Sequence, residues 1–208
     1  MLRLAIPALL LTAIFSLALG ACHLQQANSS VKAYFGDCTL PCWQGITPGL
    51  TSTNAAMAQF NAASSSAPLH YPCSSPPALV CDRYLWAQSG NPALNVEMEV
   101  VYGEIGEIAA FAPPFTLGEV ILMMEAEHKP VIGAYPSYAA GNQFYAQVLF
   151  GDTHLSVQVI AACSGTYLDL MQTPVSDVIV ESPGARQHNV PVTSFASVRQ
   201  QFERVCGS

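Results

Sequence analysis

Residues 94–102 have the sequence Leu-Asn-Val-Glu-Met-Glu-Val-Val-Tyr, in which apolar and polar side chains alternate. Successive side chains of a β-strand point to opposite faces of a sheet, so the apolar residues from Val96 to Val100 share one face and Glu97 and Glu99 share the other. We predict a strand with its apolar side against a core and both carboxylates on a solvated face.

Other segments of this kind surround it. Strand residues bounded by turn formers are predicted at Leu79–Gln88, Glu107–Phe111, Asn142–Phe150, His154–Ala161 and Val175–Val180. Between the first helix and these strands, Ser64–Pro77 is rich in Ser and Pro and is predicted to be a loop.

Three helices complete the pattern. Thr51 is the expected N-cap of the first helix, and Thr116-Leu117-Gly118-Glu119 predicts a capping box at the start of the second. The third is expected over residues 193–206, where Phe195, Val198, Phe202 and Val205 form an apolar stripe.

These elements define an α+β fold, with an antiparallel sheet and about three packed helices in a domain covering residues 34–208. The helix starts at Thr51 and Thr116 are 65 residues apart, and each precedes a set of strands. This spacing suggests two tandem helix-plus-sheet repeats, 44–112 and 113–182. The alternative is that the two helix starts are similar by accident.

The N-terminus is typical of an export signal that ends in a lipid-modified cysteine. Arg3 precedes an apolar run that closes with Leu19-Gly20-Ala21-Cys22, a lipobox-like tetrapeptide. Residues 1–21 are expected to be cleaved, which leaves Cys22 as the lipidated first residue and 22–33 as a flexible tether. The expected location is the bacterial cell envelope, on the extracytoplasmic face of a membrane.

Six cysteines remain after Cys22, and an even number in an exported chain favours disulfides. Six cysteines allow 15 pairings. Local spacing favours three pairs: Cys38–Cys42, Cys73–Cys81 and Cys163–Cys206.

Charge and motif content exclude several functions. The formal net charge is −7 and no basic stripe occurs, which argues against nucleic-acid binding. Serine-hydrolase, nucleotide-binding and histidine metal motifs are also missing from the sequence, so no cofactor and no metal are expected. Glu97 and Glu99, or Glu104 and Glu107, could pair for hydrolysis, but a solvated strand face is the simpler interpretation.

Two groups of residues could carry a function. Cys38 and Cys42 could form a redox pair or a copper site, although a structural disulfide bracing a Pro-rich turn explains them more simply. Aromatic side chains suit contacts with a partner, and the preferred candidates are Trp43 and a predicted loop from Tyr135 to Tyr138.

Residues 38–51 resemble a segment near the mature N-terminus of uncharacterised bacterial lipoproteins, with the pattern Cys-x-Leu-Pro-Cys-Trp-x-Gly-Ile-x-Pro-Gly-x-Thr. The Pro-Gly-x-Thr turn that opens a helix before a meander is similar to the helix-plus-sheet units of the outer-membrane lipoprotein SmpA/OmlA group and of the β-lactamase-inhibitor-protein fold. The second helix departs from such units, since His128-Lys129-Pro130 replaces their Gly-x-Pro ending.

The sequence thus predicts a lipid-anchored binding, assembly or inhibitory module, with an envelope or extracellular protein as partner. The alternative is a metal-binding or thiol-redox protein that uses Cys38 and Cys42.

Lipidation at Cys22 can be tested directly. Because the acyl chains are attached through the thiol, Cys22→Ala should abolish incorporation of labelled palmitate and remove the mature protein from the membrane fraction. Cys38→Ala is the matched control and should keep the label. Full palmitate incorporation by Cys22→Ala would contradict the prediction.

Overall fold

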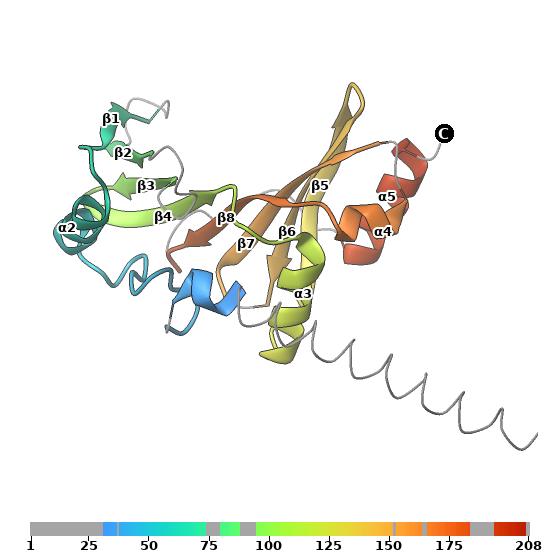
Figure 1. Cartoon of the computed structure of the whole chain (residues 1–208), viewed down its shortest axis with the longest axis horizontal. Helices are drawn as coiled ribbons and strands as arrows, with labels where there is room; N and C mark the ends of the chain where they lie inside the picture. Colours follow the sequence, from blue (N-terminus) through green and yellow to red (C-terminus); the bar gives the residue numbers. More distant parts are fainter. Residues whose placement is uncertain are drawn as a thin grey trace, which may run out of the picture.

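The computed structural model describes residues 31–36, 38–73, 80–87, 95–151, 153–163, 166–183 and 194–206. The fold is α+β, as the sequence predicts (Figure 1). Its helices are α2 (Thr53–Ala63), α3 (Leu117–Ala126), α4 (Tyr167–Met171) and α5 (Phe195–Cys206). Its strands are β1 (Leu69–Pro72), β2 (Cys81–Trp86), β3 (Val96–Val101), β4 (Glu104–Phe111), β5 (Val131–Ala140), β6 (Gln143–Phe150), β7 (Leu155–Ala162) and β8 (Val175–Glu181).

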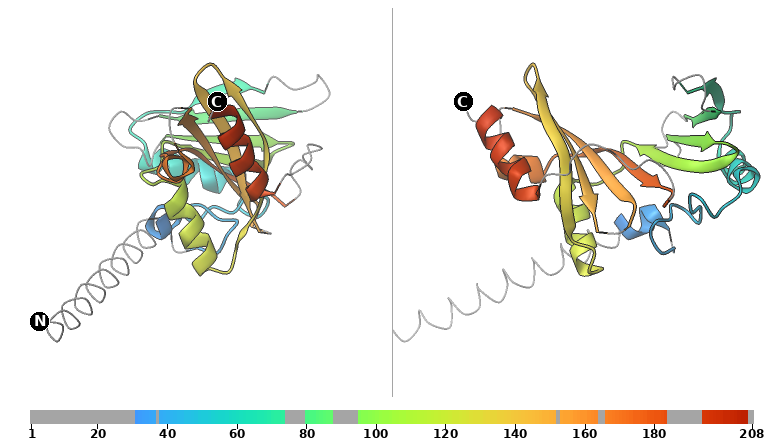
Figure 2. Two further views of the ribbon diagram at one scale, coloured as in Figure 1. Left: turned by 90° about the vertical axis from the view of Figure 1, so that its right-hand side faces the viewer. Right: turned by 180° about the vertical axis from the view of Figure 1, so that it is seen from behind.

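The strands form one eight-stranded antiparallel sheet in the order β1-β2-β3-β4-β8-β7-β6-β5. This order is symmetric about the β4–β8 pair: α2 precedes the meander β1–β4, and α3 precedes the strands β5–β8. Figures 1 and 2 show the two halves side by side, with α2 and β1 at one end of the molecule and α4 and α5 at the other. The predicted repeat boundaries, 44–112 and 113–182, stay a prediction.

One face of the sheet carries the core. Val96 and Met98 are fully buried, as the alternation in β3 predicts, and they join a single apolar cluster with Phe60 of α2, Val120 of α3 and Phe202 of α5. All the described helices contribute to this cluster, so they cover the same side of the sheet. The hydrophobic effect therefore fixes which face of each strand points inward.

The packed part of the chain begins earlier than Tyr34. Residues 31–35 are helical, and Val31 is completely buried within the core cluster. Residues 31–33, which the sequence predicts to be part of the tether, thus belong to the folded structure. The rest of the predicted tether and the signal segment lie outside the described residues.

Hydroxyl side chains cap the helices. The predicted capping box is confirmed: Thr116 Oγ1 accepts from the Glu119 backbone N–H, and the Glu119 carboxylate accepts from the Thr116 N–H at 2.7 Å. The first helix begins one residue later than predicted. Ser52 is its N-cap, whereas Thr51 Oγ1 accepts a hydrogen bond from the Thr47 N–H in the preceding turn.

Two strands are missing from the sequence prediction, and both lie at an edge of the sheet. β1 forms within the predicted Ser/Pro-rich loop and ends at Pro72, while β5 contains Gly133 and Pro136. An inner strand donates backbone N–H groups to the strands on both of its sides. A proline has no N–H, so it is tolerated in an edge strand. The same Pro and Gly residues interrupt the sequence pattern of a strand, so β1 and β5 are not predicted from the sequence.

Three disulfides are present, and their pairs are those that local spacing favours: Cys38–Cys42, Cys73–Cys81 and Cys163–Cys206. Cys163–Cys206 ties the end of α5 to the residue that follows β7. The α5 stripe is only partly buried, because Val198 and Phe202 are 1% exposed whereas Val205 is 39% exposed.

The packing of α5 provides a stability test. Phe202 meets Phe144 edge to face at a centroid distance of 5.1 Å, so Phe202→Ala should lower the free energy of unfolding by about 3–5 kcal/mol through the cavity that it leaves. Urea denaturation measures the change. Leu168→Ala is the control, since Leu168 is 65% exposed, and should cost less than about 0.5 kcal/mol. Equal losses would contradict the packing described.

Candidate functional site

The candidate site is the sheet face that lies opposite the helices, which we call the outer face. Strand register places its side chains in rows that run across the strands, and three successive rows pass through Glu181, Ile179 and Asp177 of β8. The first row is acidic, the second is closely packed at its centre, and the third carries amides and tyrosine.

The acidic row crosses five strands. Tyr71, Arg83, Glu99, Glu107 and Glu181 lie in register on β1, β2, β3, β4 and β8. Three carboxylates are therefore cross-strand neighbours on adjacent strands, an arrangement that by itself opposes folding because like charges in register repel. The row concentrates negative charge on the outer face.

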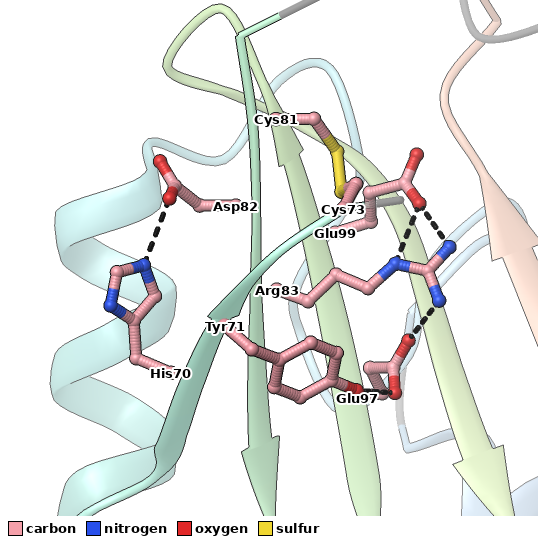
Figure 3. The surroundings of a disulfide bond; sticks show 8 residues. All are labelled: His70, Tyr71, Cys73, Cys81, Asp82, Arg83, Glu97 and Glu99. Carbon is pink, nitrogen blue, oxygen red and sulfur yellow. Dashed lines mark hydrogen bonds and ion pairs between the residues drawn. A yellow bond between two sulfur atoms is a disulfide. The ribbon is translucent and has the colours of Figure 1, made fainter. Parts of the chain in front are cut away.

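Arg83 organises the β1–β3 end of this row, as Figure 3 shows. Its Nη1 lies 2.9 Å from Glu97 Oε1, and its Nη2 lies 2.6 Å from Glu99 Oε2. Its Nε donates a further hydrogen bond to Glu99 at 3.1 Å, while the Tyr71 hydroxyl donates to Glu97. One guanidinium therefore holds two carboxylates that alternate along β3.

The prediction that Glu97 and Glu99 lie on a solvated face is wrong. The side chain of Glu99 is 6% exposed and that of Glu97 is 15% exposed. Breaking an ion pair at this depth would leave an uncompensated charge, so Arg83 is required once both glutamates are present. Alternation shows that the two glutamates share a face, but the identity of the neighbouring cation depends on strand pairing.

The protonation equilibria of this network follow from burial and charge. Burial acts against the charged guanidinium, but hydrogen bonds and attraction from Glu99 and Glu97 outweigh it and raise the pKa of Arg83. The hydrogen bond to Glu97 and burial raise the pKa of Tyr71. Arg83 stays a cation and Tyr71 stays a donor at neutral pH.

The middle row is closely packed. Ala109 of β4, Ile179 of β8 and Ser156 of β7 follow one another in register and are 7%, 7% and 5% exposed. Ser156 Oγ accepts a hydrogen bond from the Gln147 amide at 2.8 Å. These three residues form a closely packed centre of the outer face, between its acidic and its amide rows.

The third row carries Tyr135, Gln147, Gln158 and Asp177 across β5, β6, β7 and β8. Tyr135, Gln147 and Gln158 line a cavity of about 270 Å³ together with Ile160, which is 42% exposed. Burial and the nearby charge of Glu181 raise the pKa of Tyr135. Hydroxyl and amide groups beside an apolar side chain can bind a partner through mixed contacts.

The structure corrects the setting of the aromatic candidates. Tyr135 and Tyr138 lie in edge strand β5, with a register shift between them, and not in a loop. The backbone of Tyr138 is opposite that of Tyr145. Trp43 is 2% exposed, so its ring belongs to the core and not to the accessible surface that a binding role needs.

The Cys38–Cys42 pair also has a structural setting. Cys42 is 2% exposed, and the Cys38 Sγ lies 3.5 Å from the carbonyl oxygen of Phe35. The disulfide closes the turn before Trp43, as the simpler sequence interpretation proposes. The redox and copper alternative stays a hypothesis.

Figure 3 also shows two other groups of side chains, one on each face of the sheet. In the described part of the chain, the atoms that approach metal-binding geometry belong to Cys73, Cys81 and Glu99, all within 4.8 Å of one another. Both sulfur atoms are engaged in a disulfide and Glu99 binds Arg83, so this group is already committed. On the helix side of β1 and β2, His70 Nε2 lies 2.8 Å from Asp82 Oδ1.

Fold and site define an α+β protein with an eight-stranded antiparallel sheet and a polar, acidic outer face. Comparisons of the chain with family models, curated proteins and solved structures return no match. Within the described ranges, none of the helices is both long and apolar enough to cross a membrane.

Asp177 gives this face a pH dependence. Burial raises its pKa, although Ser176 Oγ donates a hydrogen bond to its carboxylate at 2.9 Å. The folded state therefore binds the proton more tightly than the unfolded chain, and this stabilisation is complete below about pH 4 and lost as pH rises through the folded pKa. The free energy of unfolding of Asp177→Asn, relative to that of the parent, should therefore increase as pH rises from 3 to 7. Urea unfolding at each pH measures this difference.

Asp169 is a control of opposite sign. Hydrogen bonds from the Thr166 backbone N–H and side chain lower its pKa, so its contribution is present at neutral pH and lost on acidification. Asp169→Asn should lose stability relative to the parent as pH rises. The same trend in both variants would contradict these assignments.

Proposed function

We propose that this protein is a lipid-anchored, extracytoplasmic binding module that docks a basic region of a protein partner on the outer face of its sheet. The observation that carries the proposal is the acidic row, with Glu99, Glu107 and Glu181 in register on three adjacent strands. A docking face needs only charge that complements its partner, and the acidic row supplies it.

The charge of the chain supports a basic partner. The net charge is −7, and the acidic row adds a local negative field over β3, β4 and β8. Such a field attracts a positively charged partner and orients it before contact, which raises the association rate at low ionic strength.

The amide and tyrosine row supports a protein as the partner. Gln147 and Gln158 can both donate and accept hydrogen bonds, and Tyr135 combines a large ring with a hydroxyl. Ile160 adds an exposed apolar contact beside them. Protein interfaces combine such an apolar and aromatic part with a polar rim.

The role of Cys22 in the proposal rests on the lipobox-like sequence. Two or three acyl chains would hold the domain at a membrane, because binding by a single chain is reversible.

Site-specific photocrosslinking in intact cells tests the docking face. A benzophenone amino acid at Ile160, 42% exposed on the outer face, should give a crosslinked protein adduct. The matched control is Leu122, 46% exposed on α3, which should give none. The adduct should weaken as salt is raised, because the Debye length falls to about 3 Å at 1 M.

Charge reversal identifies the contribution of the acidic row. Glu107→Lys with Glu181→Lys should abolish the Ile160 adduct, whereas Glu125→Lys on α3 should preserve it. Fragment masses should place the crosslink in a basic segment of the partner. An adduct from Leu122 alone, or one that survives reversal of both glutamates, would overturn the proposal.

A further inference from the structure

The two lysines of this chain, Lys32 and Lys129, line the same cavity although they are 97 positions apart. Lys32 belongs to the helical residues 31–35, and Lys129 follows α3. In a chain with a net charge of −7, this cavity brings both lysines together.

The cavity has a volume of about 390 Å³. Phe35, Leu40 and Met123 supply its apolar lining, and the lysines and Glu127 supply its charged groups. Sites for small ligands are typically about 300–1,000 Å³ and combine an apolar wall with a few convergent polar groups. The lining therefore suits a ligand with an anionic end and an apolar end.

Lys32 pairs with Glu127, and another anion can replace Glu127 in this pair. Lys32 Nζ lies 3.0 Å from Glu127 Oε1, and the two side chains are 60% and 47% exposed. An exposed pair of this kind contributes little to stability, so Lys32 can exchange Glu127 for another anion.

The position of the cavity relates it to the proposed anchor. Nine residue steps separate Cys22 from Val31, and a fully extended chain of that length spans at most about 30 Å. If Cys22 is lipidated, the cavity beside Lys32 stays within reach of the lipid headgroups.

We propose that this cavity binds the phosphodiester headgroup of an anionic phospholipid. Lys32 and Lys129 contact the phosphate, while the glycerol and the first acyl carbons lie over Phe35 and Leu40. The assignment of a lipid as the ligand rests on the proposed membrane anchor. Headgroup binding would hold the α3 end of the domain against the membrane.

Lysine acetylation measures occupancy, because the chain has two lysines that both line the cavity. The full chain, carrying Arg199→Lys as a reference amine on α5, is purified in uncharged detergent micelles and treated with acetic anhydride. Peptide masses then give separate rates for Lys32, Lys129 and position 199. Dihexanoyl phosphatidylglycerol is the probe, and dihexanoyl phosphatidylcholine and inorganic phosphate are the controls.

Phosphatidylglycerol should slow the acetylation of Lys32 and Lys129 and leave the rate at position 199 unchanged. Neither control should protect at the same concentration. Protection by phosphatidylcholine would show that net charge is not recognised, and protection by inorganic phosphate would show a free-phosphate site. Either result, or no protection, would overturn the proposal.

Charge variants sharpen the test. Lys129→Gln should weaken the protection read at Lys32 by about fivefold, the value expected for one lysine near an anionic lipid surface. Glu127→Gln should strengthen protection at Lys32, because it removes the carboxylate that Lys32 binds. Protection unchanged by both variants would contradict the assigned contacts.

The result is independent of acylation. Binding in micelles does not require a lipid on Cys22. A protein that binds phosphatidylglycerol but incorporates no palmitate would therefore support the proposed headgroup site and contradict the proposed anchor. A protein that is acylated but shows no protection of its lysines would support the proposed anchor and contradict the proposed headgroup site.

Discussion

The pairing of β4 with β8 is the constraint on which the rest of this structure depends. It joins a meander that follows α2 to the strands that follow α3, and it places Ile108 opposite Val180. A shift of one residue would turn every side chain of β8 to the other face, and Val178 and Val180 would leave the core. One register therefore assigns the helices to one side and leaves Glu107 and Glu181 adjacent on the other.

The outer face combines repulsion with local compensation. Arg83 binds Glu97 and Glu99 at the β3 end, where the carboxylates are most deeply buried. Toward β8 the row continues with Glu107 and Glu181, which are half-buried. Glu107 and Glu181 lie near the middle of the sheet, and we regard this part of the row as the more suitable place for a basic partner.

The sequence carries enough information to predict the fold class but less to predict the site. Val96 and Met98 are recognisable as core residues because their alternation is a local property of one strand. Arg83 cannot be matched to Glu99 in the same way, because their contact depends on which strands pair and in what register. The choice between Thr51 and Ser52 as N-cap fails for a related reason, since adjacent hydroxyl residues differ only in the backbone conformation that each adopts. Val31 lies in a short polar segment without periodicity, so its burial depends on distant packing.

Pro136 in β5 affects how copies of this protein meet one another. If the proposed anchor holds the protein on a membrane, its copies diffuse in two dimensions and collide often, and an open strand edge would favour their growth into extended sheets. Pro136 has no N–H to offer, and the register shift beside it distorts the edge of β5. Strand pairing between the β5 edges of neighbouring copies is therefore disfavoured.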